Sequence, residues 1–144
     1  MPRADDSAPV WVHAVSVGET RAAVPLIEAL LAEDPSRWVL LTHMTPTGRE
    51  TGETLIAGRW PQRVRQAYLP YDLGVSMARF LGRWRPRLGI LMETELWPSL
   101  CHEARRAGVP LALVNARLSA RSQRKGERWR SLIEPALRSL TLVQ

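Results

Sequence analysis

The chain has 144 residues, 45% hydrophobic and 24% charged, values typical of one globular domain with its own core. Its net charge of +6 predicts an anionic partner (nucleic acid, a membrane surface or an anionic substrate), the alternative being a solvated basic face. The single cysteine, Cys101, excludes an intrachain disulfide, and no apolar run is long enough to cross a bilayer.

Short apolar runs alternate with longer amphipathic stretches, a pattern that predicts βαβ units around a parallel sheet. The predicted strands are, in chain order, residues 10–15, 38–41, 64–69, 88–92, 109–114 and 140–143. The predicted helices are residues 21–32, 49–56, 75–84, 98–107 and a polar, basic stretch at 118–138. The expected fold is therefore α/β, a Rossmann-like parallel sheet of about six strands with helices on both faces.

Residues 1–9 are expected to form a flexible lead-in to one domain that spans residues 10–144. No helix follows the last predicted strand, which predicts a domain cut from a longer protein; the alternative is a natural small protein. Pro25 falls in the first turns of its predicted helix, where proline is tolerated. Asp72 is placed to cap the third helix and Gly108 to end the fourth.

Four loops follow predicted strands and are expected to share one edge of the sheet, where their polar groups suit a ligand site. These loops are Ser16–Glu19, His43–Gly48, Glu93–Pro98 and Asn115–Ser119. Glu19 stands near the start of a helix, whose dipole favours an ionised carboxylate, and such a carboxylate can accept a proton from a hydroxyl. The alternative is a glutamate that only neutralises the helix dipole.

Glu93 and Glu95 flank Thr94 directly after a strand and point the same way in an extended segment. They can orient a cation or stabilise developing positive charge, or they can serve only as caps of the next helix. Thr45–Gly48 offers hydroxyls and backbone N–H groups that suit a phosphate or carboxylate. This turn lacks the lysine and spacing of a P-loop, and the chain has no G-x-G-x-x-G, so nucleotide binding by this chain is not predicted.

His13 lies in an apolar strand and is expected to be a core histidine, while His43 and His102 are isolated. No cluster of histidine and cysteine has metal-ligand spacing, so neither a metal nor another cofactor is expected. No nucleic-acid partner is expected either, because the chain lacks a recognised DNA-binding motif and the aromatic pattern of single-strand readers.

Five segments in this order resemble the 3-deoxy-D-manno-octulosonic acid (Kdo) transferases of lipopolysaccharide biosynthesis. The segments are Trp11–Glu19, Thr45–Gly48, Tyr68–Leu73, Met92–Pro98 and Asn115–Ser122, and the resemblance covers about residues 10–144. It implies a GT-B glycosyltransferase of which this chain matches the amino-terminal, acceptor-binding half, the carboxyl-terminal donor domain being absent. Ser99 departs from the family, which usually has asparagine there; both residues can cap a helix.

The resemblance also implies a reaction: transfer of Kdo from CMP-Kdo to a lipid A precursor with inversion and without a further cofactor. Glu19 matches the family's proton acceptor, and Glu93 matches its transition-state stabiliser. The candidate acceptor-binding residues in these loops are Ser16, Gly18, Thr45, Thr47, Gly48, Glu95, Arg117 and Ser119.

Because a lipid A precursor carries phosphates and sits in the inner membrane, the resemblance implies a location at the cytoplasmic face of that membrane. A basic face would attract both the bilayer surface and the phosphates of the acceptor, and salt would weaken this attraction. Without a donor half, the chain alone is expected to be inactive. The alternative function is a non-catalytic basic module that binds an anionic glycolipid or a membrane surface.

Overall fold

The computed structural model describes residues 8–69, 74–92 and 98–114. Its strands and helices alternate as the sequence predicts, with one π-helical turn, η1, inserted after the second helix. In chain order they are β1 (Val10–His13), α1 (Val17–Glu33), β2 (Val39–His43), α2 (Pro46–Gly52), η1 (Glu53–Ala57), β3 (Val64–Tyr68), α3 (Gly74–Trp84), β4 (Leu88–Leu91), α4 (Pro98–Ala107) and β5 (Leu111–Leu113).

The strands of the described residues form one parallel sheet in the order β3-β2-β1-β4-β5. The central strand β1 pairs with β2 on one side and with β4 on the other, so that His13 lies opposite both Thr42 and Leu91. The chain moves outward from β1 to β3, then crosses back to place β4 beside β1. This reversal makes the carboxyl ends of β1 and β4 a topological switch point, the place where open α/β sheets bind ligands.

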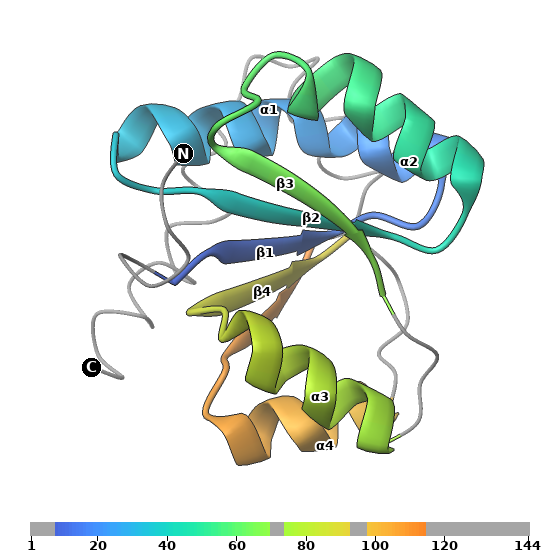
Figure 1. Ribbon diagram of the computed structural model, residues 1–144, viewed down its shortest axis with the longest axis vertical. Helices are drawn as coiled ribbons and strands as arrows, with labels where there is room; N and C mark the ends of the chain where they lie inside the picture. The colour runs from blue at the N-terminus through green and yellow to red at the C-terminus, as the bar shows by residue number, and fades with distance from the viewer. Residues whose placement is uncertain (1–7, 70–73, 93–97, 115–144) are drawn as a thin grey trace.

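Helices α1 and α2 cover one face of the sheet, and α3 and α4 cover the other (Figure 1). Side chains of a strand alternate between the two faces. Val10 and Val12 accordingly belong to the buried cluster that includes the apolar side of α1, whereas Trp11 packs on Phe80 of α3 with ring centroids 5.0 Å apart. The predicted α/β class, parallel sheet and helices on both faces are confirmed.

The lead-in, the sixth strand and the basic helix at 118–138 fall largely or wholly outside the described residues, as does Asp72. Of the lead-in, Ala8 and Pro9 are described; Pro9 is buried, and its carbonyl accepts a hydrogen bond from the Arg87 N–H at 3.0 Å. Among the helices that the structure describes, none combines the length and hydropathy that a membrane span requires.

Helix α1 begins at Val17, one turn before the predicted start at residue 21. Ser16 has an extended backbone and its hydroxyl accepts a hydrogen bond from the Glu19 N–H, so the helix starts directly after it. The prediction that Pro25 lies in the first turns is therefore wrong. Pro25 is buried inside α1, where it removes one hydrogen bond of the helical ladder.

The other large boundary differences lie around α2. β2 runs to His43 instead of residue 41, and α2 begins at Pro46 instead of residue 49. A capping threonine, Thr45, followed by proline at the first helical position explains the early start. The predicted end of this helix at residue 56 falls within η1, which follows α2 directly, and the remaining boundaries agree with the predictions within about two residues.

Candidate active site

The carboxyl edge of the sheet brings together two of the four predicted loops. Ser16–Glu19 follows β1 and Thr45–Gly48 follows the neighbouring β2. The end of β4 reaches the same edge, because the Met92 N–H donates to the His13 carbonyl at 2.9 Å. The remaining predicted site residues, Glu93, Glu95, Arg117 and Ser119, lie outside the described residues.

Glu19 lies in the first turn of α1 and is half-buried. Its Oε1 accepts a hydrogen bond from the Val15 N–H at 2.9 Å, and its own N–H donates to Ser16 Oγ at 3.1 Å. This pair resembles a capping box in which the carboxylate reaches one residue further back than usual. The carboxylate is thus held at the switch point beside the first amides of α1, which stabilise negative charge. Both interpretations of Glu19, proton acceptor and helix-start residue, agree with this geometry.

Gly18 has no packing reason to be glycine. It is exposed, and a Cβ built on it would meet only Ser16 Oγ, at 3.9 Å. The missing side chain therefore leaves open space in front of the turn that carries Glu19. Such space allows a ligand to approach the backbone closely.

The second turn lies directly against the first. Thr45 Oγ1 accepts a hydrogen bond from the Gly48 N–H at 3.0 Å, which caps α2, and donates a long one of 3.5 Å to the Val15 carbonyl. Thr47 is exposed, with its Oγ1 3.4 Å from Thr45 Oγ1. Gly48 is buried, and a Cβ on it would lie 2.8 Å from the Val15 carbonyl oxygen. The absence of a side chain at Gly48 permits this close packing.

A buried histidine supports α2 from the side of the sheet. His43, the last residue of β2, is fully buried, and a Cβ on Gly52 would lie 2.7 Å from its Cε1. Gln66 Nε2 lies 2.9 Å from His43 Nε2 and donates to the Arg49 carbonyl at 2.9 Å. Burial lowers the pKa of His43 to about 4; the Ala14 carbonyl acts in the opposite direction, and the charges of His13 and Arg49 add to the lowering.

A second polar cluster lies on the opposite face, at the carboxyl ends of β1 and β2. Trp11 Nε1 donates to Thr42 Oγ1 at 2.7 Å, and His13 Nδ1 forms a 2.8 Å hydrogen bond with the same hydroxyl. His13 is buried, which confirms the prediction of a core histidine. No sequence motif includes Thr42 or Gln66, and His43 has no histidine or cysteine partner at metal-ligand spacing. The signal available was the pair Gly48 and Gly52, which lie one helical turn apart and indicate a close approach.

Comparisons with known proteins identify the family. The model of the 3-deoxy-D-manno-octulosonic-acid transferase (kdotransferase) family matches residues 1–144. The chain belongs to the Kdo transferase family. It is 51% identical over 138 residues to the 3-deoxy-D-manno-octulosonic acid transferase of Bordetella pertussis, covering 95% of this chain and 32% of the relative. Against the Haemophilus influenzae transferase of the same name, identity is 37% over 134 residues, or 93% of this chain and 30% of the relative.

This member of the Kdo transferase family therefore spans about a third of the length of the curated relatives it matches. A solved structure, the "S. aureus MnaA-UDP co-structure", is similar with a TM-score of 0.54 and 10% sequence identity, covering 76% of this chain and 28% of that chain. At that identity the likeness concerns the fold alone, and it agrees with a Rossmann-like domain.

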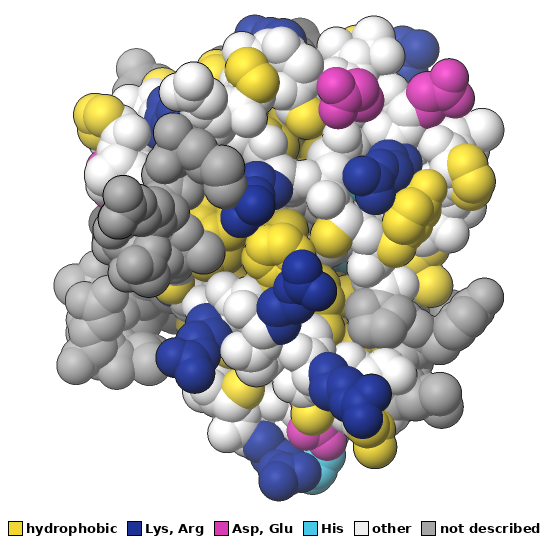
Figure 2. All heavy atoms as spheres, viewed as in Figure 1, with side chains coloured by type: hydrophobic (Ala, Val, Ile, Leu, Met, Phe, Trp, Pro, Cys, Tyr) yellow, Lys and Arg dark blue, Asp and Glu magenta, His cyan; other side chains and the backbone are white. Residues whose placement is uncertain are grey.

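A basic groove lies beside the edge strand of the Kdo transferase domain. It encloses about 550 Å³ between β3 and α3, and Arg65, Arg79 and Arg83 line it together with Trp84 and Phe80. Arg65 and Arg83 lie over the Trp84 ring at 5.8 and 5.2 Å. Among the described residues, no carboxylate forms an ion pair with these three arginines. Figure 2 shows basic side chains gathered across this face around a hollow with a hydrophobic floor.

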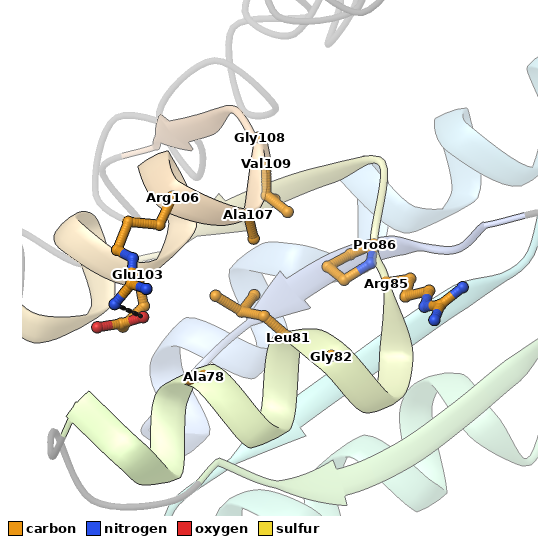
Figure 3. Close-up of a pocket in the computed structure, with 10 residues that line it drawn as sticks. All are labelled: Ala78, Leu81, Gly82, Arg85, Pro86, Glu103, Arg106, Ala107, Gly108 and Val109. Atoms are coloured by element: carbon orange, nitrogen blue, oxygen red, sulfur yellow. Dashed lines mark ion pairs between the residues drawn. The ribbon is translucent and has the colours of Figure 1, made fainter.

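A further pocket, of about 490 Å³, lies between α3 and α4 (Figure 3). Its lining includes Leu81, Pro86 and Val109, with an ion pair of 3.6 Å between Arg106 and Glu103 at its rim. Pro86 and Val109 precede β4 and β5, so the pocket lies at the amino ends of the strands. It is therefore at the opposite edge of the sheet from Glu19.

The described part of the domain offers no metal centre. Within it, no group of three or more histidine, cysteine, aspartate or glutamate side chains could hold a metal ion. Cys101 is a half-buried thiol on α4, which covers the face of the sheet opposite α1 and α2 (Figure 1). The chemistry that the described residues can offer at the carboxyl edge is that of a carboxylate, hydroxyls and backbone amides.

Proposed function

We propose that this chain is the acceptor-binding half of a two-domain GT-B enzyme that transfers Kdo from CMP-Kdo to a lipid A precursor. Membership of the Kdo transferase family and the Rossmann-like fold support this proposal. The observation that carries it is the position of Glu19, a carboxylate fixed at the topological switch point by the Val15 N–H. A second domain would bind CMP-Kdo across this edge.

In the proposed reaction, a sugar hydroxyl of the acceptor attacks the anomeric carbon of Kdo. The new carbon–oxygen bond forms as the bond from that carbon to the phosphate oxygen of CMP breaks, and CMP leaves with the electron pair. The Glu19 carboxylate accepts the hydroxyl proton, so no charge accumulates on the attacking oxygen. Attack opposite the leaving group inverts the anomeric centre without a covalent intermediate. Glu93 would stabilise the transition state.

The proposed acceptor contacts surround Glu19. Ser16 and Thr47 supply exposed polar groups, and Gly18 leaves space for the sugar beside the α1 turn. Thr45 and Gly48 border the same space. Glu95, Arg117 and Ser119 complete the proposed set from the loops after β4 and β5.

The groove between β3 and α3 supports a membrane-facing role at the cytoplasmic face of the inner membrane. Arg65, Arg79 and Arg83 present positive charge without carboxylate partners among the described residues, which suits anionic headgroups and the phosphates of a lipid acceptor. The same observation favours the second candidate function, a non-catalytic module that binds an anionic glycolipid or membrane surface. The two functions differ in whether the reaction needs the charge of Glu19.

The deciding experiment uses a chimaeric enzyme made by joining this chain to the part of the Bordetella pertussis relative that it does not cover, with CMP release as the readout. Glu19→Gln keeps an oxygen that can accept from the Val15 N–H but removes the base. We expect kcat to fall about 10²- to 10⁴-fold, the usual contribution of a positioned acid or base. Glu33→Gln, an exposed change at the other end of α1, is the matched control. If the kcat of Glu19→Gln stays close to that of the parent, Glu19 is not the base and serves only to cap α1.

A further inference from the structure

The backbone of Val15 lies between the two turns of the candidate site and contacts both. Its N–H donates to Glu19 Oε1 at 2.9 Å, and its carbonyl accepts from Thr45 Oγ1 at 3.5 Å. Any displacement of this one residue therefore changes the support of the Glu19 carboxylate. The turn after β2 is thereby connected to the proposed base through this backbone.

Gly48 sets how closely α2 approaches Val15. A Cβ at this position would lie 2.8 Å from the Val15 carbonyl oxygen and 3.0 Å from Thr45 Oγ1, so a backbone group would have to move. Glycine is unfavourable inside a helix, so its presence in a helix of seven residues calls for a packing reason. The contact with the Val15 carbonyl supplies that reason.

Helix α2 cannot easily retreat from Val15, because β2 and β3 hold it in place. The imidazole of His43 fills the space under Gly48 and Gly52, and Gln66 joins His43 Nε2 to the Arg49 carbonyl of α2. The imidazole is fully buried, and close-packed interiors transmit small shifts. The start of α2 therefore holds the Val15 carbonyl in a fixed position.

We propose that Thr45 and Gly48 are positioning residues that act on Glu19 through the backbone of Val15. The proposal rests on the proposed role of Glu19 as the base. Reactions that depend on oriented groups lose about 10²-fold in rate for a misplacement of about 1 Å. Loss of the α2 contact moves the Val15 N–H and releases the carboxylate from its orientation, so the effect falls on kcat.

The kinetic test compares Gly48→Ala and Thr45→Val with their parent in the chimaeric enzyme. We expect kcat to fall about 10- to 100-fold in both variants, because the base is displaced; a lost acceptor contact would appear separately, as a rise in the acceptor KM. Thr45→Ser retains the hydroxyl and should recover most of the rate. Gly82→Ala is the matched control, because this helical glycine of α3 has nothing within 4 Å of a built Cβ. A rise in acceptor KM with unchanged kcat would assign both residues to acceptor binding and overturn the positioning role.

A second test does not depend on activity. In the 144-residue chain labelled with ¹⁵N-valine, the Val15 amide proton should shift with pH as Glu19 ionises, and Glu19→Gln should abolish this shift. Gly48→Ala and Thr45→Val should reduce the shift to less than half, and Thr45→Val remains usable if Gly48→Ala does not fold. An undiminished shift in both variants would overturn the proposal. If the shift is lost in these variants but Glu19→Gln remains active, the coupling stands and the proposed base role fails.

Discussion

The two faces of the sheet differ in how closely their helices approach the strands. On one face, Gly48 of α2 lies against the Val15 carbonyl, and Gly52 lies against the His43 imidazole. On the other, α3 leaves a groove of about 550 Å³ along β3, floored by aromatic rings and bordered by arginines. Chemistry requires atoms held within fractions of an ångström, whereas electrostatic attraction acts over the Debye length and needs no fixed geometry. The face covered by α2, called here the tight face, therefore suits the proposed base. The face covered by α3, called here the open face, suits an anionic partner.

Matched glycine substitutions give the largest expected contrast between the faces. Gly52→Ala should lower the free energy of unfolding by about 1–3 kcal/mol, because its Cβ would meet Gln66 Nε2 at 2.6 Å and the His43 ring at 2.7 Å. Gly82→Ala on α3 should raise it by up to about 1 kcal/mol, because the site is open and alanine favours the helix. Urea denaturation of both variants measures the difference. If the two substitutions changed the free energy of unfolding equally, the proposed difference in packing between the two faces would be contradicted.

Paired arginine substitutions test the open face. Arg79→Gln with Arg83→Gln should weaken binding to phosphatidylglycerol vesicles about 30-fold at low salt, since each basic residue near an anionic surface contributes about 1 kcal/mol. The control, Arg59→Gln with Arg106→Gln, makes the same change in net charge at arginines that pair with Glu28 and Glu103. Vesicle sedimentation measures both affinities. Equal losses would show that net charge, and not the groove, governs binding.

The buried histidine of the tight face gives a smaller, pH-dependent effect. Because burial holds the pKa of folded His43 at about 4, below the ordinary value of 6.5, the unfolded chain binds more protons as pH falls below 6.5. The contribution of neutral His43 to the free energy of unfolding is therefore fully present above pH 6.5 and is lost as the pH falls toward 4. The expected loss between pH 7 and 5.5 is about 1 kcal/mol. Denaturation curves at both pH values measure this loss. His43→Gln should flatten the profile, and an unchanged slope in that variant would exclude His43 as its cause.

Local sequence patterns predicted most of the fold, because periodicity and helix-stop residues act over a few neighbours. The helix at Pro98–Ala107 and the starts of β1, β3 and β4 agree with the structure for this reason. The start of α1 was missed because Val17 and Gly18 carry no helical periodicity, while the cap at Ser16 decides the boundary. Pro25 was misplaced as a consequence.

The candidate site was predictable in part. The rule that parallel strands end at one edge placed Ser16–Glu19 beside Thr45–Gly48, and the structure brings these turns into contact. The importance of His43 was not predictable, because it depends on how closely α2 lies on β2. The two glycines, Gly48 and Gly52, lie one helical turn apart and indicate that α2 packs closely on a neighbour, but their spacing does not show which residue that neighbour is.

The sequence by itself determined the alternation of strands and helices, the two-sided burial of the central strands and the excess of positive charge. These properties follow from the side chains and their spacing. Only the tertiary structure decided that β4 lies beside β1 and that Val15 joins the two turns. Strand order and the contacts of a helix with a distant turn are set by the packing of segments far apart in the chain, which no local pattern encodes. That packing placed Glu19 at the switch point.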